Sequence, residues 1–586
     1  MYLENINDIS DIKKIKKEEL PQLAKEVREA LIYKLSNTGG HVGSNLGVVE
    51  LSVALHYVFE SPKDKIVWDV SHQCYPHKIL TGRKDAYSNP DKFKNVTGFT
   101  NPKESEHDLF TIGHSSTSIS LALGLAKGRD VFGGKENIIA IIGDGAMSGG
   151  EAYEGLNYAG EYGKNLIIIL NDNEQSVAEN HGGLYKKLTA LRQTNGLCED
   201  NLFKGLNLDY LYYEHGNDVI GLVDVLEKAK DIDHPLVIHI HTVKGKGLKY
   251  AEEDREEWHS GAPFNIEDGV PKNGYPKYDT TVYDSLINLL ETDDKSIVLT
   301  AGTPRALGFV GQVRDEWEKI GRFIDVGIAE ENAMAISSGI ARYGGNAVFG
   351  AYAPFLQRTY DQLSHDLCLN NNPATILVLM PGAYGMKSNT HLGLCDIQMF
   401  SHVPNLIYLS PAYREEYIRM FDYAVKQKEH PIAIRVPNRF INSGMEEVTD
   451  YSILNKSKVV KEGKDVAIIA VGTLIPKALE IIAEVEKKLN IAITLINPIY
   501  LTGVDEDLLN KTGENHSLVV TLEDGELDGG YGQRVASFYG PSEVRVINYG
   551  ISKHFHSDFN ADELLAENGI SADNIIDVIR NTFLID

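Results

Sequence analysis

The sequence predicts an α/β protein made of three domains, each built on a parallel sheet. Its 586 residues are too many for a single hydrophobic core, so the chain is expected to divide into several domains. Short apolar runs rich in β-branched residues alternate along it with longer segments of helical periodicity, an order typical of parallel sheets. The stretch 138–180 contains the most informative of these strand–helix–strand units.

The two strands of this unit end in short polar motifs. An apolar strand, 138–142, runs into the triplet GDG, and a second strand, 166–170, runs into NDN. Because strand–helix–strand crossovers are right-handed, both strands end at the same edge of the sheet, where open α/β sheets bind ligands. Asp144 and Asn173 are therefore expected to meet there. Their carboxylate and amide oxygens suit Mg²⁺.

Composition narrows the classes of function. The formal charge of −26 argues against a nucleic-acid groove or an anionic membrane surface as partner. The N-terminus has no apolar core like that of a signal peptide, and no apolar run approaches the roughly twenty residues that span a bilayer. The four cysteines are scattered without metal-type or redox-type spacing, so we expect a cytoplasmic protein with reduced thiols.

Before the central unit, three histidines lie at loop or strand-end positions. A helix over 20–35 is followed by the glycine-rich loop 39–47, which contains His41, and by a helix through residue 58. The strand 65–70 leads to His72, and His114 lies in the motif GHSSTS. Small neighbouring residues predict a shared cleft for these histidines, whereas their spacing is not that of a zinc site.

After the central unit, residues 180–184 are expected to form a loop. The strand 235–242 leads into the KGKG motif, where Lys244 is a candidate phosphate contact and a solvated turn is the alternative. Residues 251–277 are charged and rich in proline and glycine, and we interpret them as a linker. His259 lies within them and could fold back over the site.

Two further α/β regions follow. One begins near residue 278 and the other near residue 452. In the first of them a helix is expected over 334–343. The predicted strands of the two regions are 296–300, 322–326, 347–352, 375–380 and 431–436, then 465–471, 492–496 and 517–522.

Several longer strings resemble one enzyme family over essentially the full length of the chain. They are GGHVGSNLG, WDVSHQCYPHKILTGR, GFTNPKESEHD, GHSSTSIS and GDGAMSGGEAYEGLN. The chain resembles the 1-deoxy-D-xylulose-5-phosphate synthases, relatives of transketolase and of the pyruvate dehydrogenase E1 component. The resemblance implies a cytoplasmic homodimeric transferase of isoprenoid and thiamine biosynthesis, which depends on thiamine diphosphate (ThDP) and Mg²⁺. It would decarboxylate pyruvate and condense the two-carbon unit with glyceraldehyde 3-phosphate, releasing CO₂.

The resemblance also implies domains and site residues. A diphosphate- and Mg²⁺-binding domain would cover 1–277, a pyrimidine-binding domain 278–445 and a transketolase C-terminal-type domain 446–586. Glu330 would be the catalytic carboxylate against the aminopyrimidine of the cofactor. His41, His72 and His259 would serve catalysis. Further cofactor contacts would be Gly113, His114, Ser115, Ser116, Gly143, Gly145, Ala146, Lys244 and Phe355. Metal ligands would be Asp144, Asn173 and the carbonyl of Gln175, and substrate contacts would be His41, Tyr352, Arg358, His391 and Arg439.

The second region departs from the family's pattern in the substrate pocket. The family has arginine where this chain has Met380 and Asn438, aspartate where it has Lys387, and histidine where it has Asn332. Methionine and asparagine cannot reproduce the bidentate pairing of arginine with phosphate. The missing charge could come from Lys387, Arg435 or Arg439.

Two alternatives therefore stay open. One is a transketolase-type enzyme or 2-oxo-acid carboligase that keeps the cofactor and uses another donor or acceptor. The other is a catalytically silent paralogue that serves as a binding or scaffold subunit. Retention of Asp144, Asn173 and Glu330 argues against the silent paralogue.

Overall fold

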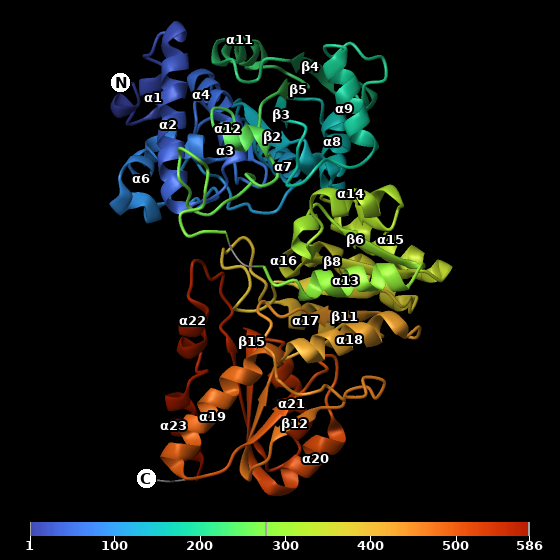
Figure 1. Ribbon diagram of the computed structural model, residues 1–586. Helices are drawn as coiled ribbons and strands as arrows, with labels where there is room; N and C mark the ends of the chain where they lie inside the picture. Colours follow the sequence, from blue (N-terminus) through green and yellow to red (C-terminus); the bar gives the residue numbers. More distant parts are fainter. Residues whose placement is uncertain (1, 276–277, 584–586) are drawn as a thin grey trace. The chain divides into compact units, whose positions relative to one another are not determined.

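The computed structural model describes residues 2–275 and 278–583, and its contacts divide the chain into two compact units. Unit 1 covers Met1–Lys277 and Gly327–Ala329, and unit 2 covers Tyr278–Val326 and Glu330–Asp586. Figure 1 shows that each unit is built from strands covered by helices. Each is described separately here.

Unit 1 contains a five-stranded sheet in the order β1-β2-β3-β5-β4, and every pair in it is parallel. Alternate residues of β2 enter different cores, because successive side chains of a strand point to opposite faces. One core packs α2, α4 and α11, and the other packs α7 and α8. The strands are Lys65–Trp68, Ile138–Gly143, Leu166–Asp172, Asp209–Tyr213 and Pro235–His241, and these helices are Leu20–Thr38, Val49–Val58, Val219–Ala229, Ser118–Phe132 and Gly150–Tyr162.

Unit 2 contains two sheets. The first has the order β10-β11-β9-β8-β6-β7 with all pairs parallel. Helices α15 and α17 contribute to the core on one of its faces, and α13 and α18 to the core on the other. Its strands β6 to β11 are Ser296–Thr300, Phe323–Asp325, Asn346–Tyr352, Thr375–Leu379, Ile407–Leu409 and Ile432–Arg435, and the helices are Glu330–Tyr343, Asp396–Ser401, Thr281–Thr292 and Arg414–Lys426.

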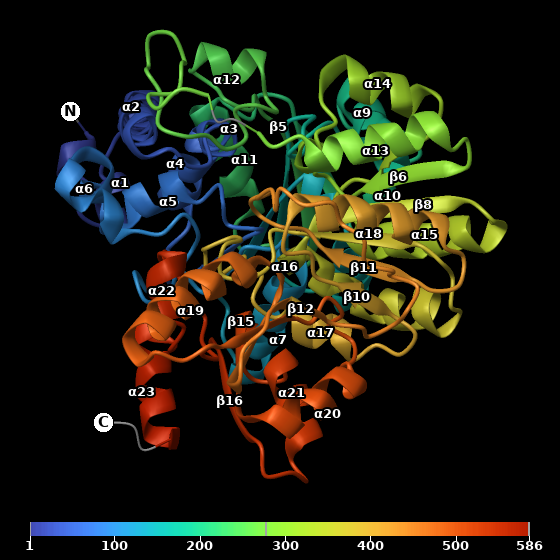
Figure 2. The same ribbon diagram turned by 60° about the horizontal axis from the view of Figure 1, so that its bottom comes forward.

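The second sheet of unit 2 has the order β12-β14-β13-β15-β16. Its edge strand β12 runs antiparallel to β14, which corrects the expectation of a wholly parallel sheet; the other pairs are parallel. Helices α19 and α23 lie side by side over one face (Figures 1 and 2), and α20 and α21 contribute to the core on the other. The strands β12 to β16 are Lys458–Lys461, Asp465–Ala470, Thr494–Asn497, His516–Glu526 and Arg545–Ile551, and the helices are Ile475–Leu489, Ala572–Phe583, Glu506–Asn515 and Tyr531–Tyr539.

One sequence interpretation within unit 1 is wrong. Residues Gly43–Gly47 form the short helix α3 instead of continuing a loop, and Gly43 packs closely against Lys244, where a Cβ atom would lie 3.1 Å from Lys244 Cγ. The expected linker belongs to unit 1, and from residue 251 to residue 275 most of its side chains are exposed or half-buried. Phe264 is buried, and its ring lies 4.8 Å from that of Trp258. The last two residues of the expected linker, Pro276 and Lys277, lie outside the described residues.

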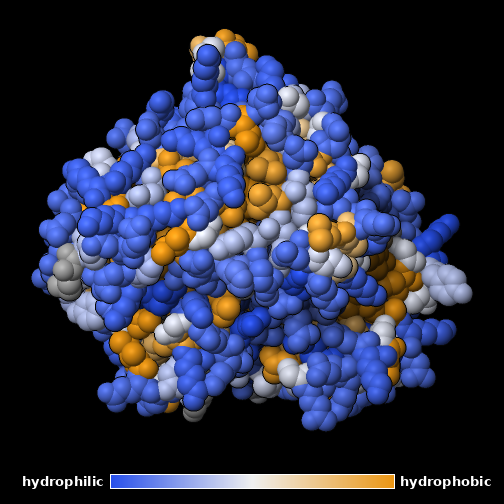
Figure 3. Space-filling view, turned by 90° about the horizontal axis from the view of Figure 1, so that it is seen from above, coloured by the Kyte–Doolittle hydropathy of each residue, from blue (hydrophilic) through white to orange (hydrophobic). Residues whose placement is uncertain are grey.

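The face drawn in Figure 3 is largely hydrophilic. Polar and charged side chains cover most of the face drawn in Figure 3, and apolar patches are scattered among them. Within residues 2–275 and 278–583, no helix combines the length and the apolar character needed to cross a bilayer.

Candidate active site

The predicted metal ligands of unit 1 are neighbours at the carboxyl edge of its sheet. Strands β2 and β3 pair so that Gly143 is opposite Asn171, and the backbone N–H of Asp144 donates to Asn171 O at 3.1 Å. The carboxylate of Asp144 is buried. Its Oδ2 atom accepts from the backbone N–H of Gln175 at 3.0 Å and from Asn180 Nδ2 at 2.7 Å. Asp144 is thus held at one oxygen by the loop that follows β3.

The electrostatics of this pocket fit a divalent cation. Burial, together with the nearby charge of Asp172, raises the pKa of Asp144 to about 8. In the described part of the chain, the buried oxygens Asn173 Oδ1, Ser176 Oγ and Asn180 Oδ1 have no hydrogen-bond partner. Unpaired buried oxygens beside a buried carboxylate form a suitable donor set for Mg²⁺.

Lys244 lies beside the same loop. It is 2% exposed, and its Nζ atom donates to Ser176 O at 2.5 Å. Burial lowers the pKa of Lys244 to about 7, while the carboxylate of Asp144 acts in the opposite direction. An anion bound here would restore the charge of this lysine, which supports its prediction as a phosphate contact.

A second buried network lies under the NDN motif. Asp172 accepts from His239 Nε2 at 2.9 Å and from Arg192, and the hydroxyl of Tyr210 lies 2.7 Å from His239 Nδ1. These contacts fix the end of β3. Gly145 must approach the following loop closely, because a Cβ atom there would lie 2.6 Å from Ser176 Oγ.

The GHSSTS motif forms a tight turn at the end of β1. Asp69 is fully buried and accepts from the backbone N–H groups of Ser116 and Ser118 at 2.8 and 2.9 Å. Ser116 has a positive φ of 76°, and its hydroxyl donates to Ala146 O at 2.6 Å. The motif therefore contacts the residues directly after GDG, as expected for two loops around one ligand. In this turn Gly113 and Ser115 are buried and His114 is half-buried.

The structure brings three predicted histidines together. The ring centroids of His41 and His72 are 5.2 Å apart, and His259 lies 5.9 Å from His41 and 5.4 Å from His72. Burial lowers the pKa of His41 to about 4 and holds that of His259 well below its usual value. These two imidazoles are therefore neutral at pH 7.

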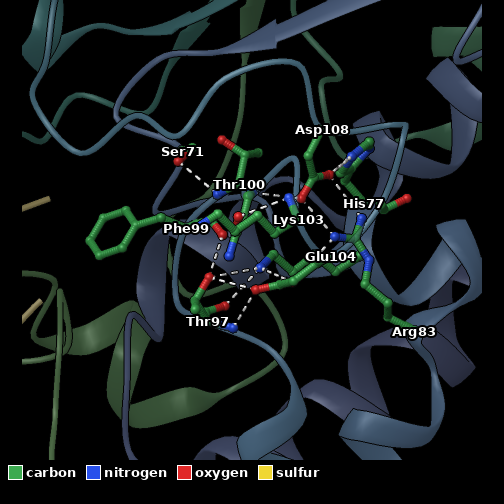
Figure 4. A network of polar contacts seen from close by, with 12 residues as sticks. Ser71, His77, Arg83, Thr97, Phe99, Thr100, Lys103, Glu104 and Asp108 are labelled. Carbon is green, nitrogen blue, oxygen red and sulfur yellow. Dashed lines mark hydrogen bonds and ion pairs between the residues drawn. The ribbon is translucent and has the colours of Figure 1, made fainter. Parts of the chain in front are cut away.

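A polar network holds the loop beside these histidines (Figure 4). Asp108 accepts from His77 Nε2 at 2.9 Å and from both Nη atoms of Arg83 at 2.6 and 2.9 Å. Glu104 accepts from Lys78 Nζ at 2.7 Å. The same loop contains Phe99, whose ring lies 5.6 Å from that of His41. These ion pairs thereby shape one wall of the histidine cluster.

In unit 2, Glu330 is buried at the first position of α15, four residues before the expected start of that helix. Its Oε2 atom has no hydrogen-bond partner within the described residues. Burial raises the pKa of Glu330 to about 7, and the nearby charge of Arg358 acts in the opposite direction. A carboxyl group with a pKa near neutrality is suited to proton transfer.

An aromatic group in unit 2 contains three more predicted residues. Phe355 lies 5.7 Å from the ring of Tyr352 and 5.5 Å from that of His391. His391 Nδ1 is 2.8 Å from the hydroxyl of Thr390, which fixes the orientation of the imidazole. Arg358 is half-buried two residues after the end of α16, the helix Ala353–Leu356.

The substituted positions of the pocket differ in their surroundings. Asn438 donates to Pro381 O at 2.8 Å and links the loops after β11 and β9, whereas Met380 is half-buried with a φ of 53°. Arg435 cannot supply a free charge as suggested above. It is 2% exposed and donates to Asp396 Oδ2 at 2.7 Å and to Asp524 Oδ1 at 2.6 Å. The exposed residues of this set are Asn332, Lys387 and Arg439.

Asn180 contacts the predicted metal ligand Asp144 but is not among the residues predicted from the sequence. It follows Asn173 by seven positions in an irregular segment, so no periodic pattern points to it. The sequence points to Asn180 in one indirect way. A buried Asp144 needs hydrogen-bond donors, and the polar residues that follow NDN are close enough in sequence to provide them. Tyr185 was missed for the same reason; its hydroxyl donates to Asp144 O at 3.2 Å.

Comparisons with known proteins agree along the whole chain. Residues 3–199 match the family model described as 1-deoxy-D-xylulose-5-phosphate synthase, 276–442 match the transketolase pyrimidine-binding domain, and 455–575 match the transketolase C-terminal domain. The 1-deoxy-D-xylulose-5-phosphate synthase of Alkaliphilus oremlandii is 37% identical, with 99% of each chain covered. That of Shouchella clausii is 38% identical, with 99% of this chain and 98% of the relative covered. A solved transketolase from Campylobacter jejuni is 17% identical over 96% of this chain and 99% of its own, with a TM-score of 0.43.

Proposed function

Because this chain belongs to the 1-deoxy-D-xylulose-5-phosphate synthase family of transketolase-class transferases, we propose that it decarboxylates pyruvate and joins the two-carbon unit to glyceraldehyde 3-phosphate. The transketolase-type pyrimidine-binding domain implies ThDP, and Mg²⁺ is proposed as its metal. The observation that carries this proposal is the buried carboxylate of Asp144 beside the unpaired oxygen of Asn173. When bound, ThDP supplies the nucleophilic carbon that takes up the two-carbon unit and stabilises the charge left by CO₂.

The residues of unit 1 would bind the diphosphate and the metal. Asp144, Asn173 and the carbonyl of Gln175 would be the protein ligands of Mg²⁺, which keeps its remaining positions for phosphate and water oxygens. Lys244 would neutralise a phosphate oxygen and regain its proton in doing so. The diphosphate would also be met by the residues after GDG and by the GHSSTS turn, namely Gly143, Gly145, Ala146, Gly113, His114, Ser115 and Ser116.

The residues of unit 2 would act on the aminopyrimidine and the substrates. The Oε2 atom of Glu330 would exchange a proton with a ring nitrogen, a task for which its pKa of about 7 is suited. Phe355 would pack on the pyrimidine ring. Tyr352, Arg358, His391 and Arg439 would contact the substrates.

The histidine cluster would handle the oxygens of the substrates. With a pKa lowered by burial, His41 and His259 are neutral and can each both donate and accept a hydrogen bond. His72 completes the cluster. Neutral imidazoles can orient a carbonyl or hydroxyl group and move a proton without placing a permanent charge in the cleft.

A second candidate function keeps the cofactor but changes the acceptor or the donor. It is favoured by the neutral side chains of Met380 and Asn438 and by Arg435, whose charge is satisfied by Asp396 and Asp524. A non-phosphorylated aldehyde would need no cation at these positions. In this case the chain would act as a transketolase-type enzyme or a 2-oxo-acid carboligase.

We further propose a cytoplasmic homodimer with domains 1–277, 278–445 and 446–586. The resemblance of the chain to the family supports this proposal. Sedimentation of the purified chain would test this proposal, and a monomer at micromolar concentration would refute it.

The deciding experiment is to incubate the protein with ThDP, Mg²⁺ and pyruvate, with and without glyceraldehyde 3-phosphate, while CO₂ release is measured. The synthase proposal expects release that depends on the aldehyde, together with a deoxyxylulose phosphate product. If no CO₂ is released by a protein that binds ThDP, the second candidate is favoured. Unchanged turnover in Glu330→Ala would remove Glu330 from the mechanism.

A further inference from the structure

One buried side chain links the two histidine-bearing segments of unit 1. Asn45 lies in α3 and is 0% exposed. Its Nδ2 atom donates to His41 O at 2.8 Å and to His72 O at 2.7 Å, and its Oδ1 atom accepts from the backbone N–H of Tyr75 at 2.8 Å. We infer that Asn45 is a positioning residue that sets the separation of His41 and His72.

The side chain of Asn45 makes hydrogen bonds to the backbone of these three partners. Both amide hydrogens are donated to backbone carbonyl oxygens and the amide oxygen accepts from a backbone N–H, so all three bonds of this side chain go to backbone atoms. Any effect of Asn45 on catalysis must therefore pass through the backbone of the residues it holds.

The backbone next to His72 explains why such a link is needed. Val70 and Ser71 have positive φ angles of 57° and 63°, a region that β-branched and other non-glycine residues rarely adopt. Such a conformation persists only where surrounding contacts over-determine it. On one side Ser71 Oγ donates to Ile112 O at 2.8 Å and accepts from the backbone N–H of Thr100 at 3.0 Å. Asn45 holds the other side of the same turn.

The link also reaches the ring of His41. Tyr75, whose backbone N–H donates to Asn45, places its hydroxyl 3.5 Å from His41 Nδ1. Asn45 therefore fixes the backbone of His41, the backbone of His72 and the residue that lies against the His41 imidazole. These constraints act on the two residues whose ring centroids lie 5.2 Å apart.

Three variants and a matched control test the inference. Asn45→Ala removes all three bonds, Asn45→Ser retains one hydroxyl donor, and Asn45→Asp replaces two donors by a carboxylate facing two carbonyl oxygens. Asn137→Ala is the control. Asn137 is 2% exposed, donates to Asp64 and Asp231 at 3.1 and 2.9 Å, and precedes the amino end of β2, at the edge of the sheet opposite to GDG.

The first measurement is backbone hydrogen–deuterium exchange of the ligand-free protein, followed by mass spectrometry. In Asn45→Ala, peptides covering 39–48 and 69–78 should exchange about tenfold faster or more, while peptides covering 330–343 should keep the wild-type rate. Asn137→Ala should accelerate exchange around 134–140 and leave 39–48 and 69–78 unchanged. If these two peptides keep the wild-type rate in every Asn45 variant, the inference is wrong.

The second measurement is steady-state kinetics, and its link to catalysis rests on the proposed function. Asn45→Ala should lower kcat by about 10- to 100-fold through misplaced histidines, with the affinity for ThDP within about threefold of wild type. Asn45→Ser should recover part of this loss. Asn45→Asp should lose least at low pH, where protonation restores one donor. Asn137→Ala should keep kcat within about twofold of wild type.

The two measurements separate two kinds of failure. If wild-type protein does not turn over pyruvate and glyceraldehyde 3-phosphate, the proposed function fails, and the exchange data still decide the role of Asn45. If kcat falls equally in Asn45→Ala and Asn137→Ala, or if ThDP binding falls as much as kcat, Asn45 serves only stability and the inference is overturned. If Asn45→Ala does not fold, Asn45→Ser provides the same comparison.

Discussion

The proposed metal pocket of unit 1 and the proposed substrate pocket of unit 2 differ in how well they match the pattern that the family resemblance implies. In unit 1, motif and geometry agree: Asp144 and Asn173 follow adjacent strand ends, and the loop that donates to Asp144 also carries unpaired buried oxygens. In unit 2, Glu330 matches the expected catalytic carboxylate, while Met380 and Asn438 stand where the resemblance leads us to expect arginine. A metal ion and a diphosphate need the same ligands whatever the substrate is, so the residues that bind the cofactor can stay the same when the substrate changes. The acceptor pocket depends on a few loop side chains, so it can change.

The largest expected effect is at the metal pocket. In Asp144→Asn the buried carboxylate is replaced by a neutral amide that cannot provide a charged ligand to Mg²⁺. We expect turnover to fall by about a thousandfold or more, together with loss of Mg²⁺-dependent ThDP binding. Isothermal titration with ThDP, with and without Mg²⁺, would measure this loss. Wild-type affinity in the variant would contradict the metal assignment.

Glu330→Gln is expected to separate activity from stability. Activity should fall by about 10²- to 10⁴-fold, since glutamine cannot exchange a proton with the cofactor. Stability should rise, because the pKa of Glu330 is about 7 in the folded protein and is near 4.5 when unfolded. Between these values the folded state holds a proton that the unfolded state lacks, so wild-type stability falls as pH rises.

Glutamine does not titrate, so the advantage of Glu330→Gln in unfolding free energy should grow from pH 5 to pH 8. At pH 8 it should reach about 2–3 kcal/mol. Urea denaturation of both proteins at the two pH values would measure it, with Glu331→Gln as the control on the same turn of α15. An equal difference at both pH values would show that burial does not raise the pKa of Glu330.

An intermediate effect is expected at Asn180. Asn180→Ala removes one of the donors to Asp144 Oδ2 and one unpaired oxygen of the pocket, while the donor from the Gln175 backbone remains. Mg²⁺ affinity should fall by about tenfold, in the range seen when the hydrogen-bond partner of a metal ligand is removed. Electron paramagnetic resonance with Mn²⁺ as the probe would measure the change. Asn165→Ala, which removes a half-buried amide that donates to Asn137 and to Ile232 O before the amino end of β3, is a control outside the pocket.

The parts of the site that could be predicted from the sequence are those whose positions follow from how the strands and loops are connected. The ends of β2 and β3 were predicted to lie together because a right-handed crossover requires it, and the structure confirms their adjacency. The approach of His41 to His72 and the return of His259 toward them were also expected, and ring distances of 5.2–5.9 Å confirm both. Small residues beside His41 and His72 were the signal for their approach, because glycine permits close packing of the backbone, and the place of His114 in the same cleft stays a prediction.

Sequence reasoning failed where partners are distant in the chain and follow no pattern. Arg435 was a candidate for a free charge, but Asp396 and Asp524 neutralise it from positions 39 and 89 residues away. The antiparallel strand β12 was missed because its sequence, KVVK, is short and half-exposed. Asn45 and Asn180 escaped notice because a single asparagine has no periodicity, and its role depends on the backbone groups that surround it.

The smallest expected effect would sharpen the contrast between the two pockets. Asn438→Arg places a guanidinium in the loop after β11, next to the exposed Arg439, and removes the bond to Pro381 O. Asn438→Ala removes the same bond without adding a charge and is therefore the matched control. If the acceptor carries a phosphate, Asn438→Arg should lower the KM for glyceraldehyde 3-phosphate by about three- to tenfold relative to Asn438→Ala, because a charge-assisted hydrogen bond is gained.

The KM for non-phosphorylated glyceraldehyde should stay the same in both variants. An equal change for the two aldehydes would mean that position 438 does not face the acceptor phosphate, and that the neutral residues at 380 and 438 do not define the choice of substrate.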